Sequence, residues 1–179
     1  MNPLSNALRQ HNGPDTFNDE EDRNAVLDFF RRDKRFCRFV KESFQLTEPV
    51  DELRPDPLGQ MKVDLGLYRN NQLLGLIEVD HYTSWNPNWP NNYRWCHALV
   101  RKIKYWQGVG LPYIACTFNM QRDKMLVSTD EMQKKYMYTK KVKKVKLNGK
   151  WEDDLFLEIP LPVSEKFGKW TEEELRRVS

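Results

Sequence analysis

The chain has 179 residues, of which 39% are hydrophobic and 31% are charged, and its formal net charge is +3. This length is sufficient for one domain with its own hydrophobic core. No apolar run approaches the roughly 20 residues that a membrane-spanning helix needs, and the polar amino terminus lacks the hydrophobic region of a signal peptide, so the composition argues against a membrane protein and against a secreted one.

The three cysteines, Cys37, Cys96 and Cys116, are an odd number and do not have the spacing of metal ligands. This pattern argues against a disulfide framework and favours a reducing, cytoplasmic setting, or the interior of a host cell if the protein is viral. The small net charge does not by itself indicate a nucleic-acid partner, although Lys and Arg gather in two parts of the chain.

Residues 1–17 show no periodicity and are expected to form a flexible arm. Asn18 followed by Glu21 resembles a helix capping box, and apolar residues follow at helical spacing. The sequence therefore predicts a first helix from about residue 19 to about residue 33. The globular domain is expected over residues 18–163.

Residues 61–82 form the segment on which the functional prediction depends. Two short arms rich in leucine, β-branched and aromatic residues flank Asn70-Asn71, which predicts a β-hairpin. Asp64 lies in the first arm, and Glu78 and Asp80 lie in the otherwise apolar second arm. Carboxylates in a half-buried strand are costly unless they are neutralised, and a divalent cation is the commonest partner that does so. The hairpin is therefore a candidate metal site.

The pairing of the two arms decides whether the three acids meet. Side chains alternate along a strand, so Glu78 and Asp80 share a face. Asp64 joins that face only if the numbers of paired residues add up to an even value. A regular hairpin with a two-residue turn at Asn70-Asn71 would put Asp64 on the opposite face, so the metal site requires a longer connection or a β-bulge.

The loop that follows the hairpin contains Trp85 and Trp89. These side chains either stack on nucleic-acid bases or fold back onto the core. A helix is predicted over residues 93–107, with Arg101, Lys102 and Lys104 on its surface. Two strands are then predicted, over residues 111–118 and 124–128, and the order of elements indicates an α/β sheet with helices on its faces.

Eight lysines lie in residues 134–150. This segment is predicted to be an edge strand that turns at Asn148-Gly149 into a strand over residues 155–159; its charge serves either to keep the edge solvated or to contact phosphates. Residues 164–179 are expected to be a tail with a short helix, which begins at the capping box of Thr171 and Glu174.

The order Asp64, then Glu78-Val79-Asp80, then a basic helix and a buried strand resembles the PD-(D/E)XK, or restriction-endonuclease-like, nuclease superfamily, in the variant found in viruses and phages. The resemblance covers about residues 18–160. It implies an α/β fold with a mixed central sheet flanked by helices, and a DNA endonuclease that hydrolyses phosphodiester bonds with Mg²⁺ or Mn²⁺.

The same resemblance implies roles for individual residues. Asp64 and Glu78 would bind metal, and Asp80, which stands where the superfamily pattern has lysine, would be a third metal ligand. Lys102 would supply the missing lysine. A further metal-binding glutamate on the first helix would be Glu20 or Glu21.

DNA is the expected partner, with backbone phosphates on Arg101, Lys104 and the lysine-rich segment, although the sequence does not separate DNA from RNA. A homodimer is expected if both strands of a duplex are cut. A branch that resembles the very-short-patch-repair endonucleases places a catalytic histidine beside Glu-x-Asp, here His81, but strand alternation directs it away from the acids.

Other interpretations compete with an active metal site. Glu78 or Asp80 could instead pair with Arg101 or Lys102 in a structural ion pair. His97, on the predicted helix, is expected to be structural. The protein would then be a nucleic-acid-binding module without catalytic activity, or a structural protein of a virus particle.

Overall fold

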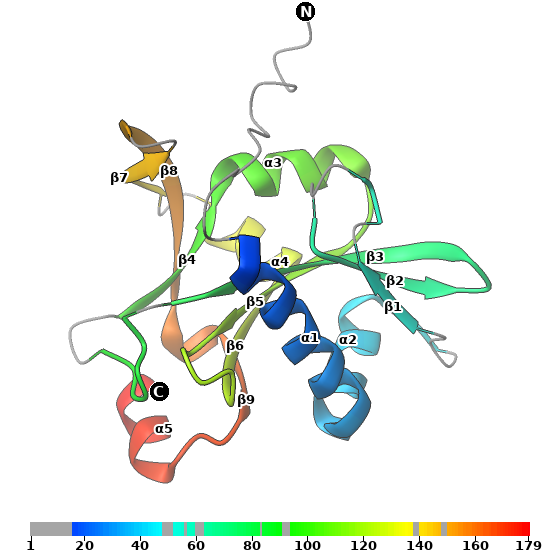
Figure 1. The fold of residues 1–179 in the computed structure, drawn as a ribbon, viewed down its shortest axis with the longest axis horizontal. Helices are drawn as coiled ribbons and strands as arrows, with labels where there is room; N and C mark the ends of the chain where they lie inside the picture. The colour runs from blue at the N-terminus through cyan, green and yellow to red at the C-terminus, as the bar shows by residue number, and fades with distance from the viewer. Residues whose placement is uncertain are drawn as a thin grey trace, which may run out of the picture.

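The computed structural model describes residues 16–47, 52–55, 57–59, 63–82, 84–90, 94–137, 140–147 and 150–179. A mixed six-stranded sheet has the order β1-β2-β3-β5-β6-β9, and a three-stranded sheet has the order β4-β8-β7 (Figure 1). The prediction of an α/β protein with helices around a mixed sheet is confirmed. The helices are α1 (Thr16–Arg32), α2 (Lys34–Ser43), α3 (Val100–Val109), α4 (Asp130–Lys135), a 3-10 turn (Leu161–Val163) and α5 (Glu172–Val178).

The strands of the larger sheet are β1 (Glu52–Pro55), β2 (Leu65–Arg69), β3 (Gln72–His81), β5 (Tyr113–Phe118), β6 (Lys124–Thr129) and β9 (Glu165–Gly168). The smaller sheet contains β4 (Trp95–Leu99), β7 (Lys140–Leu147) and β8 (Lys150–Pro160). β3 and β5 are parallel, and every other pair in both sheets is antiparallel.

Alternation along β3 divides the core into two layers. Ile77 and Val79 pack with α1 and α2 on one face of the sheet. Leu76 packs on the other face with Ile103 of α3 and Leu157 of β8. Glu78 and Asp80 have the same parity as Leu76 and therefore lie on the α3 side of the sheet.

The first helix differs in part from its prediction. α1 begins at Thr16, so Asn18 lies inside the helix and the proposed capping box there was wrong. The helix is interrupted at Asp33, between α1 and α2. Oδ1 of Asp33 accepts hydrogen bonds from the backbone N–H groups of Arg35 at 2.9 Å and Phe36 at 3.1 Å. Asp33 is thus the N-cap of α2. The flexible arm predicted for residues 1–17 lies outside the described residues, except for its last two positions.

The prediction of a helix over residues 93–107 is wrong for the first part of this range. Its first part forms β4, in which His97 is paired with Glu158 of β8, and only the later part forms α3. Residues 95–99 form a strand because they pair with β8, a distant segment that local sequence could not show. The strands predicted over residues 111–118 and 124–128 are confirmed as β5 and β6.

Part of the lysine-rich segment is an edge strand, as predicted, because β7 has β8 as its one neighbour among the described strands. Lys134 and Lys135 belong instead to α4. The predicted turn at Asn148-Gly149 lies outside the described residues. The segment predicted as a tail contributes β9, which pairs with β6 at the edge of the larger sheet, and α5 begins with the predicted capping box. A buried ion pair of 2.5 Å between Lys124 Nζ and Glu174 Oε1 joins α5 to β6.

Two further findings concern the protein's setting. In the described part of the chain, no helix is both long enough and apolar enough to cross a membrane. The three cysteines form no disulfide, and Cys96 and Cys116 are buried.

A pair of glycines tests the packing of α2 on the sheet. A Cβ atom at Gly75 would lie 2.5 Å from Cε2 of buried Phe44, whereas one at Gly108 in α3 would have no neighbour within 4 Å. We expect Gly75→Ala to lower the free energy of unfolding by about 1–3 kcal/mol through overpacking. Gly108→Ala should raise it by about 0.5–1 kcal/mol. Urea denaturation of both variants measures these changes, and equal effects would contradict the packing described here.

Candidate metal and phosphodiester site

A β-bulge brings Asp64 opposite Glu78. The turn is the two-residue Asn70-Asn71, with φ of 49° and 64°, which by itself would put Asp64 on the wrong face. The register shifts between Leu67 and Tyr68, so that Leu67 pairs with Gly75 while Tyr68 pairs with Leu73. On the side of the bulge away from the turn, the numbers of paired residues add up to an even value, as in Leu65 with Ile77. This is the pairing that the metal-site prediction requires.

The acids converge at the carboxyl end of β3. Oδ2 of Asp64 accepts a hydrogen bond of 2.8 Å from the backbone N–H of Val79, which fixes the carboxylate beside β3. Asp80 lies two residues beyond Glu78 on the same strand face, and its Oδ1 accepts from the N–H of His81 at 2.8 Å. The predicted meeting of Asp64 with the Glu-x-Asp strand therefore occurs in the structure.

Lys102, the lysine predicted to come from the following helix, reaches Glu78. Its Nζ forms an ion pair with Glu78 Oε1. Glu78 is only 6% exposed, so this charge pair is largely removed from water. The contact fits a lysine placed for catalysis, and it also fits the alternative of a structural ion pair between Glu78 and Lys102.

A carboxylate oxygen of the buried Glu78 has no hydrogen-bond partner among the described residues. Neither Oε1 nor Oε2 of this buried carboxylate has a hydrogen-bond partner among the described residues, and the ion pair with Lys102 accounts for Oε1 alone. A buried carboxylate oxygen without a donor is costly. Oε2 is therefore an available ligand atom in the interior of the site.

Burial disfavours negative charge at this end of β3. The pKa of Asp64 is raised, chiefly by burial and against the opposing effects of Lys102, the Val79 N–H and Arg23. Although part of Asp80 is open to solvent, burial also raises the pKa of its carboxyl to about 6, and the nearby charges of Asp64 and Asp22 add to the shift. A cation bound among these carboxylates would relieve this cost.

A fourth acid, Asp22 of α1, lies behind the site and was not predicted. It is 2% exposed, and its two oxygens contact His81 Nδ1 at 2.6 Å and Arg122 Nε at 2.6 Å. This network joins α1 to the end of β3 and to the turn between β5 and β6. His81 thus turns toward α1, away from Glu78, as alternation predicted.

Glu20 and Glu21, the two residues predicted to supply a first-helix ligand, lie on the exposed side of α1. The Glu21 side chain is 66% exposed and pairs with Arg122 at 3.0 Å, and Glu20 is also exposed. Helical geometry directs these two residues outward, while the next residue, Asp22, faces the sheet with Val26 one turn later. That i, i+4 relation of Asp22 to buried Val26 was the signal that could have identified it.

The two loop tryptophans are not available for stacking on bases. Trp85 is fully buried and Trp89 is 5% exposed, and their rings pack edge to face at 5.0 Å. They cover the core together with Leu126 of β6, which is the second of the two alternatives. The prediction that they bind nucleic acid is therefore wrong.

Lys104 is exposed on α3, about one turn after the helix begins at Val100. Arg101 lies in the same helix, and its side chain is outside the part of the molecule that the structure describes.

The described side chains do not form a complete metal cluster. Within those residues, no group of three or more His, Cys, Asp or Glu side chains is arranged so as to hold a metal ion. Lys102 takes one oxygen of Glu78, and the Asp64 and Asp80 carboxylates each accept a backbone N–H. The donors suit a hard cation in chemical type, since all three are carboxylates and one has an unpartnered buried oxygen.

The fold and the acids define the protein as an α/β domain with a carboxylate site at the end of its central parallel strands. No protein-family model matches the sequence, and no curated protein does. A solved structure of a nuclease from a fusselovirus is similar over 86% of this chain and 89% of its own, with a TM-score of 0.45 and 16% sequence identity. So low a similarity says nothing about activity.

Substitution of Asp22 or of Glu21 tests which acid of α1 stabilises the contacts with His81 and Arg122. Asp22→Ala leaves the partly buried Arg122 and His81 without their shared partner, and we expect it to lower the free energy of unfolding by about 2 kcal/mol. Glu21→Ala removes an exposed pair to the same arginine and should cost less than about 1 kcal/mol. Denaturant titration at neutral pH measures both, and a larger loss in Glu21→Ala would contradict this assignment.

The pKa of Asp80 predicts a pH dependence in metal-free buffer. Between about pH 4 and pH 6 the native state retains a proton that the unfolded state, with the ordinary pKa of 3.8, has lost. The native state binds more protons there, so its stability falls as pH rises through this window. Asp80→Asn removes the charge and, after allowance for solvent screening, should raise Tm by about 2–4 °C at pH 7.5.

At pH 4 the same substitution should change Tm little. Glu42→Gln, at an exposed position of α2, serves as the control and should show no such difference between the two pH values. Thermal melts in EDTA measure both variants, and an equal Tm change for Asp80→Asn at pH 4 and pH 7.5 would contradict a raised pKa of Asp80.

Proposed function

We propose that the protein is a metal-dependent nuclease that hydrolyses phosphodiester bonds of DNA at the Asp64, Glu78 and Asp80 site. The observation that carries the proposal is Glu78: a carboxylate 6% exposed, in the central strand, with Lys102 on one oxygen and no hydrogen-bond partner on the other in the described structure. The β-bulge supports the same proposal, because it sets Asp64 opposite Glu78. Two carboxylates on one face of a sheet repel each other unless a cation lies between them.

Mg²⁺ or Mn²⁺ fits the donor set, and Asp64, Glu78 and Asp80 would hold it. When bound, such an ion polarises the phosphate and lowers the pKa of a water molecule. The chain's own residues perform the remaining tasks. The Val79 N–H orients the Asp64 carboxylate, and Asp22 holds α1 against the end of β3 through His81, which keeps the strand end in place.

Lys102 would act on the reacting phosphate. Its ammonium group lies beside Glu78 and is about one-third exposed, so a substrate oxygen could reach it. A positive charge there would stabilise the negative charge that develops on the phosphate in the transition state. In the superfamily that the sequence resembles, a lysine two residues after the glutamate assists the attacking water, and Lys102 would stand in for that lysine.

A second function also has an observation in its favour. The described acids do not form a metal cluster, and Lys102 forms an ion pair with the buried Glu78. These features suit a nucleic-acid-binding module without catalytic activity. Such a module would bind DNA equally well in EDTA, and its acids would be needed for stability alone.

The deciding experiment compares the wild type with the Asp64→Ala/Glu78→Ala double variant. Supercoiled, linear, branched and single-stranded DNA, together with a single-stranded RNA, are incubated with Mg²⁺, Mn²⁺ or EDTA. We expect cleavage that requires metal and falls at least about a hundredfold in the double variant. Calorimetric titration should show Mn²⁺ binding by the wild type only. Folded wild-type protein that neither cleaves any substrate nor binds Mn²⁺ would rule the nuclease out.

Two lysines of α3 provide the matched control. Lys102→Gln should lower the cleavage rate about a hundredfold while DNA affinity changes little, because the charge acts at the reacting phosphate. Lys104→Gln removes an equal charge from an exposed position of the same helix and should affect affinity more than rate. Equal effects of the two substitutions on rate would exclude a catalytic role for Lys102.

A further inference from the structure

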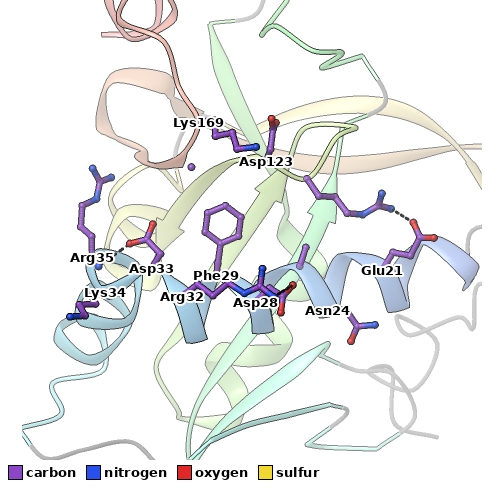
Figure 2. Close-up of a pocket in the computed structure, with 13 residues that line it drawn as sticks. Glu21, Asn24, Asp28, Phe29, Arg32, Asp33, Lys34, Arg35, Asp123 and Lys169 are labelled. Carbon is purple, nitrogen blue, oxygen red and sulfur yellow. Dashed lines mark hydrogen bonds and ion pairs between the residues drawn. The ribbon is translucent and has the colours of Figure 1, made fainter.

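A second binding site lies outside the acid site, in a cleft of about 960 Å³ between α1, the start of α2 and the turn that joins β5 to β6 (Figure 2). This volume is at the upper end of the roughly 300–1,000 Å³ range of ligand sites. Close backbone packing forms one wall: Lys169 N–H donates to Asp123 O at 2.8 Å. A Cβ atom at Gly168 would lie 2.1 Å from that same oxygen, so the wall depends on glycine.

Phe29 gives the cleft an aromatic surface. Its ring stands among the other lining side chains (Figure 2). On its inner side it contacts Phe118, with ring centroids 5.7 Å apart, and Phe36, at 6.3 Å. These contacts fix the ring, and the residue remains partly exposed. A fixed, partly open ring in a cleft is suited to stacking against another flat ring.

The acidic groups of the cleft are already engaged. Asp33 caps α2, and Glu21 pairs with Arg122 at 3.0 Å. Asp28 lies 3.8 Å from Arg32, and Asp123 Oδ1 accepts from the Asn119 amide at 2.8 Å. These carboxylates keep their charge, but the partners just named are groups other than the Lys34, Arg35 and Lys169 side chains, and the cleft is lined by five cationic side chains against four carboxylates.

Three cations in the cleft have no such compensation. Lys34, Arg35 and Lys169 line it, and among the described residues none of them has a carboxylate within 4.0 Å. Arg35 is held by a hydrogen bond to the Lys166 carbonyl and by the Phe167 ring, whose centroid lies 4.4 Å from its guanidinium carbon. Figure 2 shows Lys34 and Arg35 at the α2 end and Glu21 at the opposite end. Lys34 and Arg35 thus provide positive charge at the α2 end, beside the Asp33 carboxylate, and Lys169 stands beside Asp123.

We propose that this cleft binds a nucleotide, with the base stacked on Phe29 and the phosphate at Lys34, Arg35 and Lys169. A phosphate attached to a flat ring matches both features at once, whereas an acidic peptide would match only the charge. The nucleotide comes either from a single-stranded segment of nucleic acid or from a free mononucleotide. The proposal goes beyond the nuclease proposal and does not depend on it, because binding here needs neither metal nor Asp64 and Glu78.

The test is isothermal calorimetry in EDTA with the wild type and with the Asp64→Ala/Glu78→Ala variant. The probes are thymidine monophosphate, tetrathymidylate, inorganic phosphate and a tetra-aspartate peptide. We expect both proteins to bind the thymidine compounds equally and more tightly than the other two probes. Tetrathymidylate binding more tightly than the monophosphate would identify a nucleic-acid strand as the source, and equal affinities would identify a free nucleotide. Both results support the cleft.

Substitutions in the cleft locate the ligand. Lys34→Gln/Lys169→Gln should weaken binding about tenfold through the loss of charged hydrogen bonds. Phe29→Leu should weaken it about fivefold, and Phe29→Tyr, which keeps the ring, should retain it. Arg31→Gln/Arg38→Gln removes the same charge from exposed positions of α1 and α2 that do not line the cleft, and it should change affinity less than twofold.

Thermal melts check that each variant is folded. The proposal is overturned if the wild type binds neither thymidine compound at millimolar concentration. It is also overturned if the cleft variants bind as the wild type does, or if inorganic phosphate or the peptide binds as tightly as the nucleotide. None of these results would bear on metal-dependent cleavage, which the Asp64 and Glu78 substitutions test separately.

Discussion

The burial of a carboxylate in the central strand is the constraint on which the site depends. Glu78 stands between Ile77 and Val79, both of which pack in the core, and it is itself almost inaccessible to solvent. Such a group must have a positive partner. Lys102 is that partner, and it belongs to α3, whose Val100 and Ile103 pack with Leu76 of β3.

The same constraint accounts for the shape of the hairpin. An Asn-Asn turn with both residues at positive φ favours a tight hairpin, and uninterrupted pairing would then direct Asp64 to the face occupied by α1 and α2. The bulge beside Leu67 and Tyr68 changes the parity without lengthening the turn. The acid site thus rests on one irregular position in an otherwise regular pair of strands.

Local periodicity was sufficient to predict the hairpin, β5, β6 and the α5 capping box. It was insufficient for β4, because the apolar positions of 95–99 are compatible with either a helix or a strand until β8, some sixty positions away, is taken into account. The same limit applied to the site. Glu78 was predictable from the strand pattern, whereas Lys102 and the first-helix acid, Glu20 or Glu21, were named through the resemblance, which does not take into account the direction of each side chain on the helix. Trp85 and Trp89 belong to a core that only the folded chain brings together.

The position of β9 has a consequence for how the protein is made. β6 is covered on its outer side by β9, and the charge of Lys124 is neutralised by Glu174 of α5. Both partners follow β7 and β8 in the chain, so they leave the ribosome long after β6 does. During synthesis, β6 therefore has one unpaired edge. Lys124, which is buried in the folded protein, has no carboxylate partner at that stage. The nascent protein therefore passes through a stage in which this edge of β6 is open to pairing with other chains.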